Sequence, residues 1–234
     1  MSDTKQRKYY GGQMQDLFAE ALIPQGGTFL DIGSGGPTED NNTYLLEKKG
    51  WKGICVDSLA EEGLPKDLAS KYKEERKSKF FQVDSTTKEF INLLEENYSN
   101  KIIDYISLDV DKFSLATLKN LLGHGYNFKC MTFEHDFYRG GVNKLLKFGS
   151  KDILLKRGYF PLFEDVCLFQ HDIGNSSPWE DWWVNLNYFW NFRSVAGAAL
   201  FYRECVGRVI HLIEKRKKIQ DKVNTLNENI HSRY

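Results

Sequence analysis

Long apolar runs are missing from this sequence of 234 residues. A helix that crosses a bilayer needs ~20 consecutive apolar residues, and no stretch approaches that length. Residues 1–10 are polar and lack the apolar segment of a secretory signal. We therefore expect a soluble, cytoplasmic protein without a membrane span.

Charge of a single sign is also missing. The 32 basic residues balance 32 acidic ones, so the formal net charge is zero. A chain without a net positive field has no general attraction for a phosphate backbone or an anionic membrane. A nucleic-acid partner is therefore disfavoured, and a small molecule or a glycan is the expected partner.

Cysteine is scarce and widely spaced. The four cysteines are Cys55, Cys130, Cys167 and Cys205, and three of them lie in apolar runs. This pattern is typical of buried free thiols rather than of a disulfide framework or a zinc knuckle. It indicates a reducing compartment, in agreement with a cytoplasmic protein.

Short β-rich runs alternate with longer segments of helical periodicity between residues 28 and 170, which predicts βαβ units and a mostly parallel sheet. Three of the first five runs end on aspartate, the first has Asp31 one residue before its end, and the fifth ends on glutamate. Ligands of open α/β sheets bind at the carboxyl ends of the strands, so these acids are expected to form one site. The five runs are 28–32, 53–57, 80–84, 102–109 and 128–134.

The C-terminal part has a different character. Two runs, 159–163 and 166–170, are separated by Glu164-Asp165 and predict an antiparallel hairpin at the sheet edge. We place one domain at residues 1–175. Residues 176–234 are expected to hold an aromatic-rich segment and a C-terminal helix that packs on or extends the same domain.

The aromatic-rich segment has two interpretations, a wall for a substrate or partner and ordinary core packing. Beyond it, apolar residues at heptad positions between 209 and 230 predict a terminal helix that could support a homodimer. The aromatic residues are Trp179, Trp182, Trp183, Tyr188, Phe189, Trp190 and Phe192.

The sharpest motif is the glycine-rich turn Asp31-Ile32-Gly33-Ser34-Gly35-Gly36, directly after the first run. Its glycines allow positive φ and a close approach of a ligand to the backbone. A dinucleotide site would need a third glycine where Thr38 stands, and the acid at position 31 would repel a pyrophosphate. A carboxylate instead suits the ammonium group of S-adenosylmethionine. The motif therefore predicts a site for this cofactor that includes Asp31, Gly33, Ser34 and Gly35.

Two further strand ends extend this site. The second run ends at Asp57, followed by Ser58, where a carboxylate could accept hydrogen bonds from both hydroxyls of a ribose. The third run ends at Asp84-Ser85, which could contact an adenine amino group. The alternative for Asp84 and Ser85 is that they cap the helix that follows.

A resemblance to a known family covers about the first three fifths of the chain, through residues 15–16, 29–33, 42–47, 50–57 and 103–111. These stretches are similar to the FkbM-type methyltransferases. The resemblance implies a Rossmann-like class I methyltransferase sandwich, with a mostly parallel seven-stranded sheet, that acts on a hydroxyl of a sugar or a polyketide. It also implies that Asn42 and Thr43 lie beside the cofactor. The chain departs from the family where Lys112-Phe113 follows Asp111, since an acid-glycine pair is usual there.

The reactive end is expected at the exits of the fourth and fifth runs. Residues two apart on a strand face the same side. Asp109 with Asp111, and Glu134 with Asp136, are therefore expected at the same opening of the site. A cation would relieve the repulsion between these acids, and oxygen ligands with one imidazole suit Mg²⁺ or Mn²⁺. Without a metal, Asp111 or His135 would be the base.

The stretch 108–114 also resembles the Asp-Gly-Asp tract of metal-dependent sugar O-methyltransferases, with Val110 in place of the glycine. That resemblance implies that Asp109 is a metal ligand at the cofactor site and that Asp111 is the base. It implies that Glu134 and His135 are the later metal ligands.

Three functions remain open on these grounds. The first is an O-methyltransferase that uses S-adenosylmethionine and acts on a hydroxyl of a sugar, a glycan or a similar small polar acceptor. The second is a nicotinamide-dependent oxidoreductase, which Asp31 and Thr38 disfavour. The third is a non-catalytic interaction module that keeps the fold and has lost the cofactor.

Overall fold

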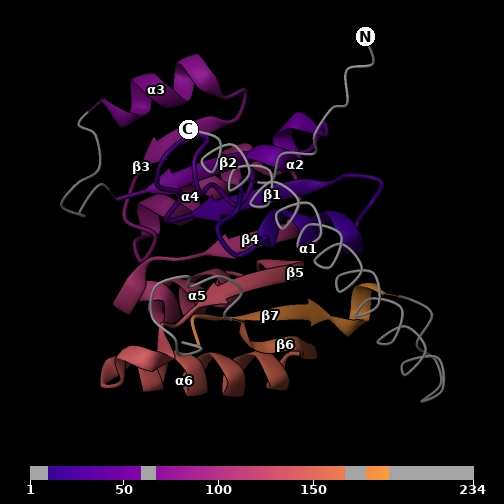
Figure 1. Ribbon diagram of the computed structural model, residues 1–234, viewed down its shortest axis with the longest axis vertical. Helices are drawn as coiled ribbons and strands as arrows, with labels where there is room; N and C mark the ends of the chain where they lie inside the picture. Colours follow the sequence, from indigo (N-terminus) through magenta and orange to yellow (C-terminus); the bar gives the residue numbers. More distant parts are fainter. Residues whose placement is uncertain (1–9, 59–66, 167–177, 190–234) are drawn as a thin grey trace, which may run out of the picture. The chain divides into compact units, whose positions relative to one another are not determined.

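A seven-stranded sheet organises the chain, in the order β3-β2-β1-β4-β5-β7-β6 (Figure 1). Strands β1 to β5 are parallel to one another, whereas β7 is antiparallel to both β5 and β6. The strands are β1 Thr28–Ile32, β2 Lys52–Asp57, β3 Lys79–Gln82, β4 Ile102–Leu108, β5 Asn127–Glu134, β6 Tyr159–Val166 and β7 Glu180–Asn185. This arrangement confirms the predicted α/β fold with an antiparallel edge.

The structure is a computed structural model that describes residues 10–58, 67–166 and 178–189. These residues belong to a unit that ends at Trp190, and residues 191–234 form a second unit outside the described residues. The predicted terminal helix and its dimer, Cys167, Cys205, Trp190 and Phe192 also lie outside them. Within the described residues, Cys55 and Cys130 are buried free thiols, as predicted.

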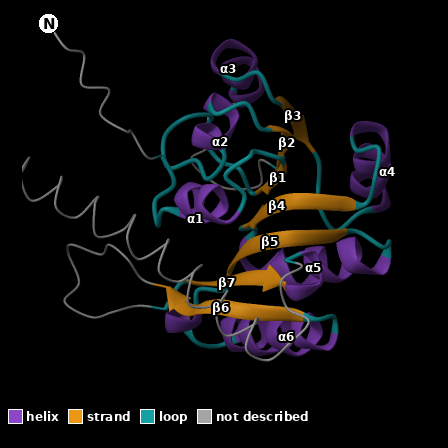
Figure 2. Cartoon of the chain, turned by 90° about the vertical axis from the view of Figure 1, so that its right-hand side faces the viewer, coloured by secondary structure: helices purple, strands orange, loops and turns teal. Residues whose placement is uncertain are grey.

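Helices cover both faces of the sheet (Figure 2). On one face, α4, α5 and α6 pack their apolar residues onto the strands and form the main core. On the other face, α1, α2 and α3 surround the glycine loop. None of the described helices is long and apolar enough to cross a membrane. The helices are α1 Gln15–Leu22, α2 Tyr44–Lys48, α3 Leu68–Glu75, α4 Lys88–Asn97, α5 Ser114–Gly123 and α6 Val142–Lys156, with short 3-10 turns η1 Asp111–Phe113, η2 Phe137–Arg139 and η3 Leu186–Tyr188.

The first five strands fall where the sequence predicts them, and the largest difference in bounds is at the end of β3. Strand β3 ends at Gln82, two residues before the predicted end at Asp84. The side chain of Asp84 explains the difference, because its Oδ1 accepts hydrogen bonds from Thr86 N at 2.8 Å and from Thr86 Oγ1 at 2.7 Å. Thr87 then caps α4 by accepting from Phe90 N. The chain therefore turns into the helix at Asp84 instead of continuing the strand.

The edge hairpin is built from different residues than predicted. Residues 159–166 form the single strand β6, with irregular pairing around Phe163, and β6 pairs with β7. Of the second predicted run, residues 167–170 lie outside the described residues. The pair Glu164-Asp165, read as a turn, lies within β6, where Asp165 takes a φ of 55°. Because β7 lies between β5 and β6, the sheet continues beyond residue 175, where the sequence analysis places the domain boundary.

Two tryptophans of β7 are core residues. Trp182 is 1% exposed and its ring lies 4.8 Å from that of Phe18 in α1. Trp183 is fully buried on the opposite face, in the cluster that includes Leu146 and Leu154 of α6. Of the two interpretations of the aromatic-rich segment, core packing therefore holds for Trp182 and Trp183.

Replacement of Trp183 tests whether β7 is an integral strand. We expect Trp183→Ala to lower the free energy of unfolding by about 3–5 kcal/mol, because it removes a large side chain from a packed core. Leu145→Ala is the control, since Leu145 is 67% exposed on α6 and its loss should change the free energy by less than about 0.5 kcal/mol. Equal effects of the two substitutions in urea denaturation would contradict the placement of β7.

Candidate functional site

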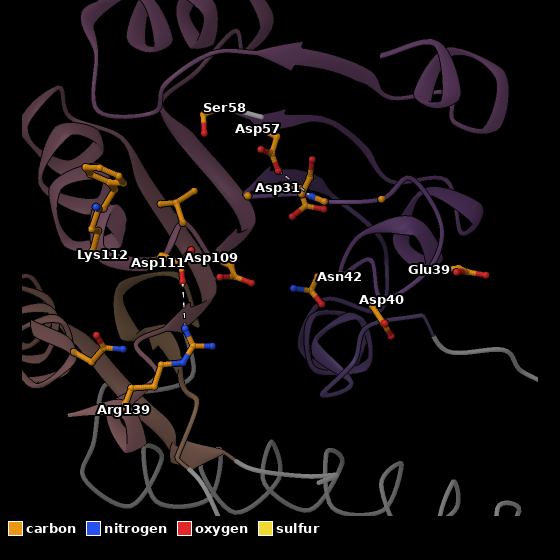
Figure 3. Close-up of a pocket in the computed structure, with 17 residues that line it drawn as sticks. Asp31, Glu39, Asp40, Asn42, Asp57, Ser58, Asp109, Asp111, Lys112 and Arg139 are labelled. Atoms are coloured by element: carbon orange, nitrogen blue, oxygen red, sulfur yellow. Dashed lines mark hydrogen bonds and ion pairs between the residues drawn. The ribbon is translucent and has the colours of Figure 1, made fainter. Parts of the chain in front are cut away.

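A cavity of about 640 Å³ opens at the carboxyl ends of β1, β2 and β4 (Figure 3). Its volume lies in the usual range of small-molecule sites. Its walls come from the glycine loop after β1, the end of β2, the segment before α2, the loop after β4 and the turn after β5. The sequence analysis expects the site at this edge of the sheet, and the structure has its largest described cavity there.

The glycine loop packs closely against β2 on one side and against the residue that follows β4 on the other. Gly33 has a φ of +77°, and a Cβ on it would lie 1.5 Å from the carbonyl oxygen of Asp109. Gly33 N and Ser34 N both donate to Val56 O, at 2.9 and 3.2 Å. Gly35 differs, because within the described residues no atom lies within 4 Å of a Cβ built on it. The loop is therefore fixed at Gly33 and open to the cavity at Gly35.

Asp31 lines this cavity from the end of β1 and is only 1% exposed. Its Oδ2 accepts a hydrogen bond from Thr43 Oγ1 at 2.7 Å. Burial raises the pKa of Asp31 to about 6, although the Thr43 hydrogen bond and the charge of Arg76 act in the opposite direction. Asp31 is therefore mainly a carboxylate at neutral pH and can attract a cationic group of a ligand.

Asp57 closes β2 and also lines the cavity, together with the neighbouring Ser58. Asp57 is 7% exposed, and its Oδ2 accepts a hydrogen bond from Gly35 N at 3.1 Å. Asp31 and Asp57 lie near each other on the rim in Figure 3. Two carboxylates of fixed orientation, Asp31 from β1 and Asp57 from β2, therefore lie beside the glycine loop.

Asn42 and Ser34 bring polar atoms without partners to the cavity. Asn42 Nδ2 donates to Ser107 Oγ at 2.9 Å, while Asn42 Oδ1 is buried and has no hydrogen-bond partner among the described residues. The buried hydroxyl of Ser34 also lacks a partner in this part of the chain. Thr43, in contrast, lies below Asp31 and does not line the cavity. Buried polar atoms are normally hydrogen-bonded, so Asn42 and Ser34 indicate a ligand with polar groups.

Asp84 and Ser85 are not among the residues that line the cavity. Asp84 forms the turn described above, and Ser85 Oγ lies 2.7 Å from Thr117 Oγ1 of α5 in a buried contact. Both residues therefore make structural contacts away from the cavity, although the cap of α4 is Thr87 and not Asp84 or Ser85.

The end of the cavity away from the glycine loop combines acids with one arginine. Arg139 Nη1 lies 3.0 Å from Asp136 Oδ2 and 3.8 Å from Asp111 Oδ1 (Figure 3). Asp111 and Asp136 both take the left-handed conformation, with φ of 49° and 46°. No sequence pattern points to Arg139, because the turn at Asp136 after β5 is what brings its side chain to the cavity. Backbone strain such as the positive φ of Asp111 and Asp136 is often found at functional sites.

Glu134 lies beside this end, at the exit of β5. Burial, followed by the charge of Asp109, raises the pKa of Glu134 far above its usual range. Glu180 is its paired residue on β7, and burial raises the pKa of Glu180 to about 8. Glu134 therefore carries a proton at neutral pH. That proton, rather than a metal ion, can relieve the repulsion between Glu134 and Asp109 that the sequence analysis anticipated.

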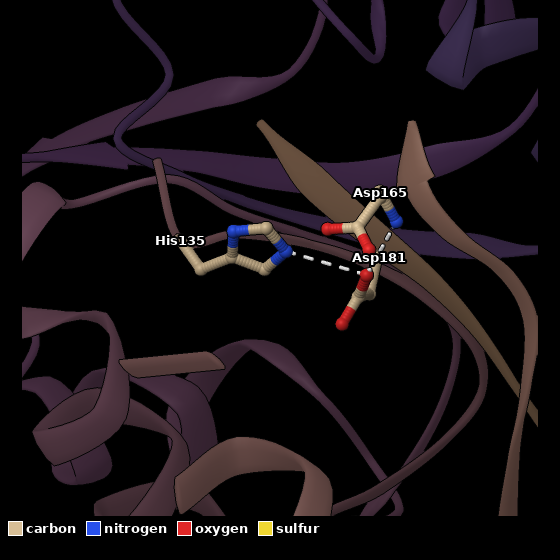
Figure 4. A group of neighbouring side chains, drawn as sticks. All are labelled: His135, Asp165 and Asp181. Atoms are coloured by element: carbon tan, nitrogen blue, oxygen red, sulfur yellow. Dashed lines mark hydrogen bonds and ion pairs between the residues drawn. The ribbon is translucent and has the colours of Figure 1, made fainter. Parts of the chain in front are cut away.

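His135 points away from the cavity. Successive residues of a strand face opposite sides of the sheet, so His135 leaves on the other side from Glu134. Its Nε2 lies 3.3 Å from Asp181 Oδ1, and both side chains are fully buried (Figure 4). The structure therefore separates His135 from Asp109 and Glu134, which corrects the predicted metal group. It also does not bring His135 to the cavity as a base.

His135, Asp165 and Asp181 form the group of described residues whose ligand atoms lie within 4.8 Å of one another. Phe137 N donates to His135 Nδ1 at 3.1 Å, so Nδ1 is the acceptor and the ring proton is on Nε2, facing Asp181. Neither nitrogen then offers a lone pair to a metal ion. Lys147 is also ion-paired with Asp165. The Phe137 N–His135 Nδ1 hydrogen bond and the close polar contact with Asp181 favour a structural role, although His135 Nε2 has no hydrogen-bond partner among the described residues.

His135→Ala tests this structural role. We expect the substitution to lower the free energy of unfolding by about 1–3 kcal/mol, because Asp181 and Phe137 N lose a buried partner. Zn²⁺ or Mn²⁺ should raise the melting temperature of the wild-type protein no more than that of the variant. A metal-induced rise seen only in the wild-type protein would contradict the structural role and indicate a metal site.

Comparison with known proteins finds no family model that matches this chain and no curated protein that is similar in sequence. Among solved structures, the chain is similar to an O-methyltransferase from Bacillus cereus in complex with SAH, at 13% identity and a TM-score of 0.51, over 73% of this chain and 80% of that chain. It is also similar to the bifunctional kinase-methyltransferase WbdD, at 13% identity and a TM-score of 0.49, over 74% of this chain and 39% of that chain. The first likeness shows that the chain has the class I methyltransferase fold. The FkbM resemblance gains no support from these comparisons.

Proposed function

We propose that the chain binds S-adenosylmethionine in the cavity and transfers its methyl group to a hydroxyl of a sugar or another small polar acceptor. One observation carries the proposal. Two buried carboxylates, Asp31 and Asp57, lie near each other beside the glycine loop and line the cavity (Figure 3). A ligand that combines a cationic amino acid with a ribose matches both of them.

The negative charge of the cavity rim favours this function over a nicotinamide-dependent oxidoreductase, and the open polar cavity favours it over a non-catalytic module. A nicotinamide dinucleotide would bring its pyrophosphate to the glycine loop, where Asp31 and Asp57 would repel it. Glu39 and Asp40 add further acids to the same walls. A non-catalytic module would have no reason to keep the open space at Gly35 or the unpartnered amide oxygen of Asn42. Both observations favour a bound small molecule.

We assign the residues that hold the cofactor from their positions on the rim. Asp31 would accept a hydrogen bond from the ammonium group, and Asp57 with Ser58 would bind the ribose hydroxyls. Gly33, Ser34 and Gly35 would line the backbone side, and Asn42 would receive a polar donor at its free Oδ1. When bound, the cofactor supplies an activated methyl group on sulfur, so the protein need only orient the acceptor and remove its proton.

Asp111 is the base that we propose for the acceptor hydroxyl. Its side chain is 50% exposed, lines the cavity and lies 3.8 Å from Arg139 Nη1. Asp109 lies next to it as a second hydrogen-bond acceptor. Asp109 and Glu134 are the residues that would hold Mg²⁺ or Mn²⁺, and the ion would supply a Lewis acid for the acceptor hydroxyl. The proposed role of Asp111 as the base does not depend on that ion.

Cofactor binding can be measured without knowing the acceptor. S-adenosylhomocysteine, the demethylated product, should bind the wild-type protein in calorimetry. We expect Asp57→Ala to weaken this binding by about 1–3 kcal/mol, because hydrogen bonds to the ribose hydroxyls are lost. Glu96→Gln, an exposed change on α4, is the control and should bind normally. The absence of binding by the wild-type protein at millimolar ligand would end the proposal.

Asp111→Asn tests the base. With a panel of monosaccharides, glycosides and polyols and a methyl-labelled cofactor, we expect turnover to fall about 10²–10⁴-fold, as for loss of a general base. Affinity for S-adenosylhomocysteine should change less than about twofold, because Asp111 lies at the other end of the cavity. Equal losses of turnover and affinity would refute the assigned role.

A further inference from the structure

We propose that Arg76 is a positioning residue that acts through the Thr43 hydroxyl to keep Asp31 charged and directed at the cavity, and that cofactor affinity therefore depends on pH through this chain of contacts. The inference rests on the proposed function, because it assigns to Asp31 the ammonium group of the cofactor. Arg76 itself does not line the cavity.

Arg76 is held rigidly behind the glycine loop. It follows α3 directly and is 7% exposed. Its Nη1 donates to Pro37 O at 2.8 Å and to Asn41 Oδ1 at 2.9 Å, and its Nε lies 3.2 Å from Glu47 Oε2. The guanidinium also lies over the rings of Tyr44 and Tyr72, at 5.3 and 5.7 Å. The positive charge therefore has one position.

Thr43 connects this charge to Asp31. Arg76 Nη2 donates to Thr43 Oγ1 at 3.1 Å, so the Thr43 oxygen acts as an acceptor there. The single hydroxyl proton is then available to Asp31 Oδ2 at 2.7 Å. The other acceptor nearby, Asn41 Oδ1, lies farther away at 3.1 Å and already accepts from Arg76 and from Thr43 N. A donor bonded to a cation is a stronger donor, so Arg76 strengthens the Thr43–Asp31 bond.

Asp31 needs this support because burial, the largest influence on its pKa, opposes its charge. Burial and the charge of Asp57 raise the pKa of Asp31, and Arg76 is the cation that lowers it. Burial also raises the pKa of the neighbouring Cys55 to about 12, so this thiol stays neutral. Several groups interact with Asp31 through their charge or through hydrogen bonds. They are Asp57 and Cys55 from β2, Tyr72 and Arg76 at α3, Thr43 and Asn41 before α2, Tyr98 after α4 and Tyr105 from β4.

The direction of the pH effect follows from the charge of Asp31. The carboxylate attracts the ammonium group, and its protonated form does not. Affinity for S-adenosylhomocysteine should therefore fall as the pH drops through about 6, where Asp31 takes up a proton. Removal of the Arg76 charge or the Thr43 hydroxyl raises the pKa of Asp31. The fall in affinity then begins at a higher pH.

The experiment measures S-adenosylhomocysteine affinity by calorimetry from pH 5 to pH 9. We expect Arg76→Gln and Thr43→Val to move the midpoint upward by about one pH unit, so that affinity at pH 6 falls about fivefold further than at pH 8.5. Arg76→Lys keeps the charge and should shift the midpoint less. Lys73→Gln removes an exposed charge from α3 and is the matched control, with the wild-type midpoint expected.

A second measurement needs no ligand. The carboxyl carbon resonance of Asp31, titrated by NMR, should show a higher pKa in Thr43→Val than in the wild-type protein. Unchanged titration in that variant, or a loss of affinity by the same factor at every pH, would overturn the role of Arg76. If the wild-type protein binds no S-adenosylhomocysteine at any pH while Asp31 titrates as expected, the proposed function fails and the contact chain from Arg76 stands.

Discussion

The close contact between the glycine loop and the exit of β4 determines the rest of the site. Gly33 approaches the carbonyl oxygen of Asp109 so closely that no Cβ fits between them. On its other side, the loop is hydrogen-bonded to Val56 of β2. This double attachment places the ends of three strands around one cavity, and it thereby fixes the positions of Asp31, Asp57 and Asp109. The open space at Gly35 exists because the loop is held elsewhere.

Several acids share this edge of the sheet, and each is accommodated differently. Asp31 is supported by Arg76 through Thr43, and Asp57 accepts a backbone N–H from the glycine loop. Glu134 keeps its proton because of burial and Asp109. Asp136 is paired with Arg139. The rim of the cavity therefore keeps negative charge at Asp31 and Asp57, which suits a cationic ligand.

The sequence allowed prediction of the parallel strands and of the acids at their ends, because both are local patterns that recur at every β-strand exit. It also led to the glycine loop and to Asp57. Strand β7 was missed, because its Trp182 and Trp183 are buried on opposite faces and show no alternation of polar and apolar residues. The direction of His135 depends on where β5 ends, and the parts played by Arg76 and Arg139 depend on contacts between segments far apart in the chain. No spacing rule in the sequence reports such contacts.

The central claim is that two buried carboxylates beside the glycine loop, Asp31 and Asp57, bind S-adenosylmethionine. A crystal structure of the protein with S-adenosylhomocysteine tests this claim most directly. The account predicts the ligand amino group within hydrogen-bond distance of Asp31 and both ribose hydroxyls on Asp57. A ligand bound elsewhere, or bound in the cavity with its amino group remote from Asp31, would contradict it.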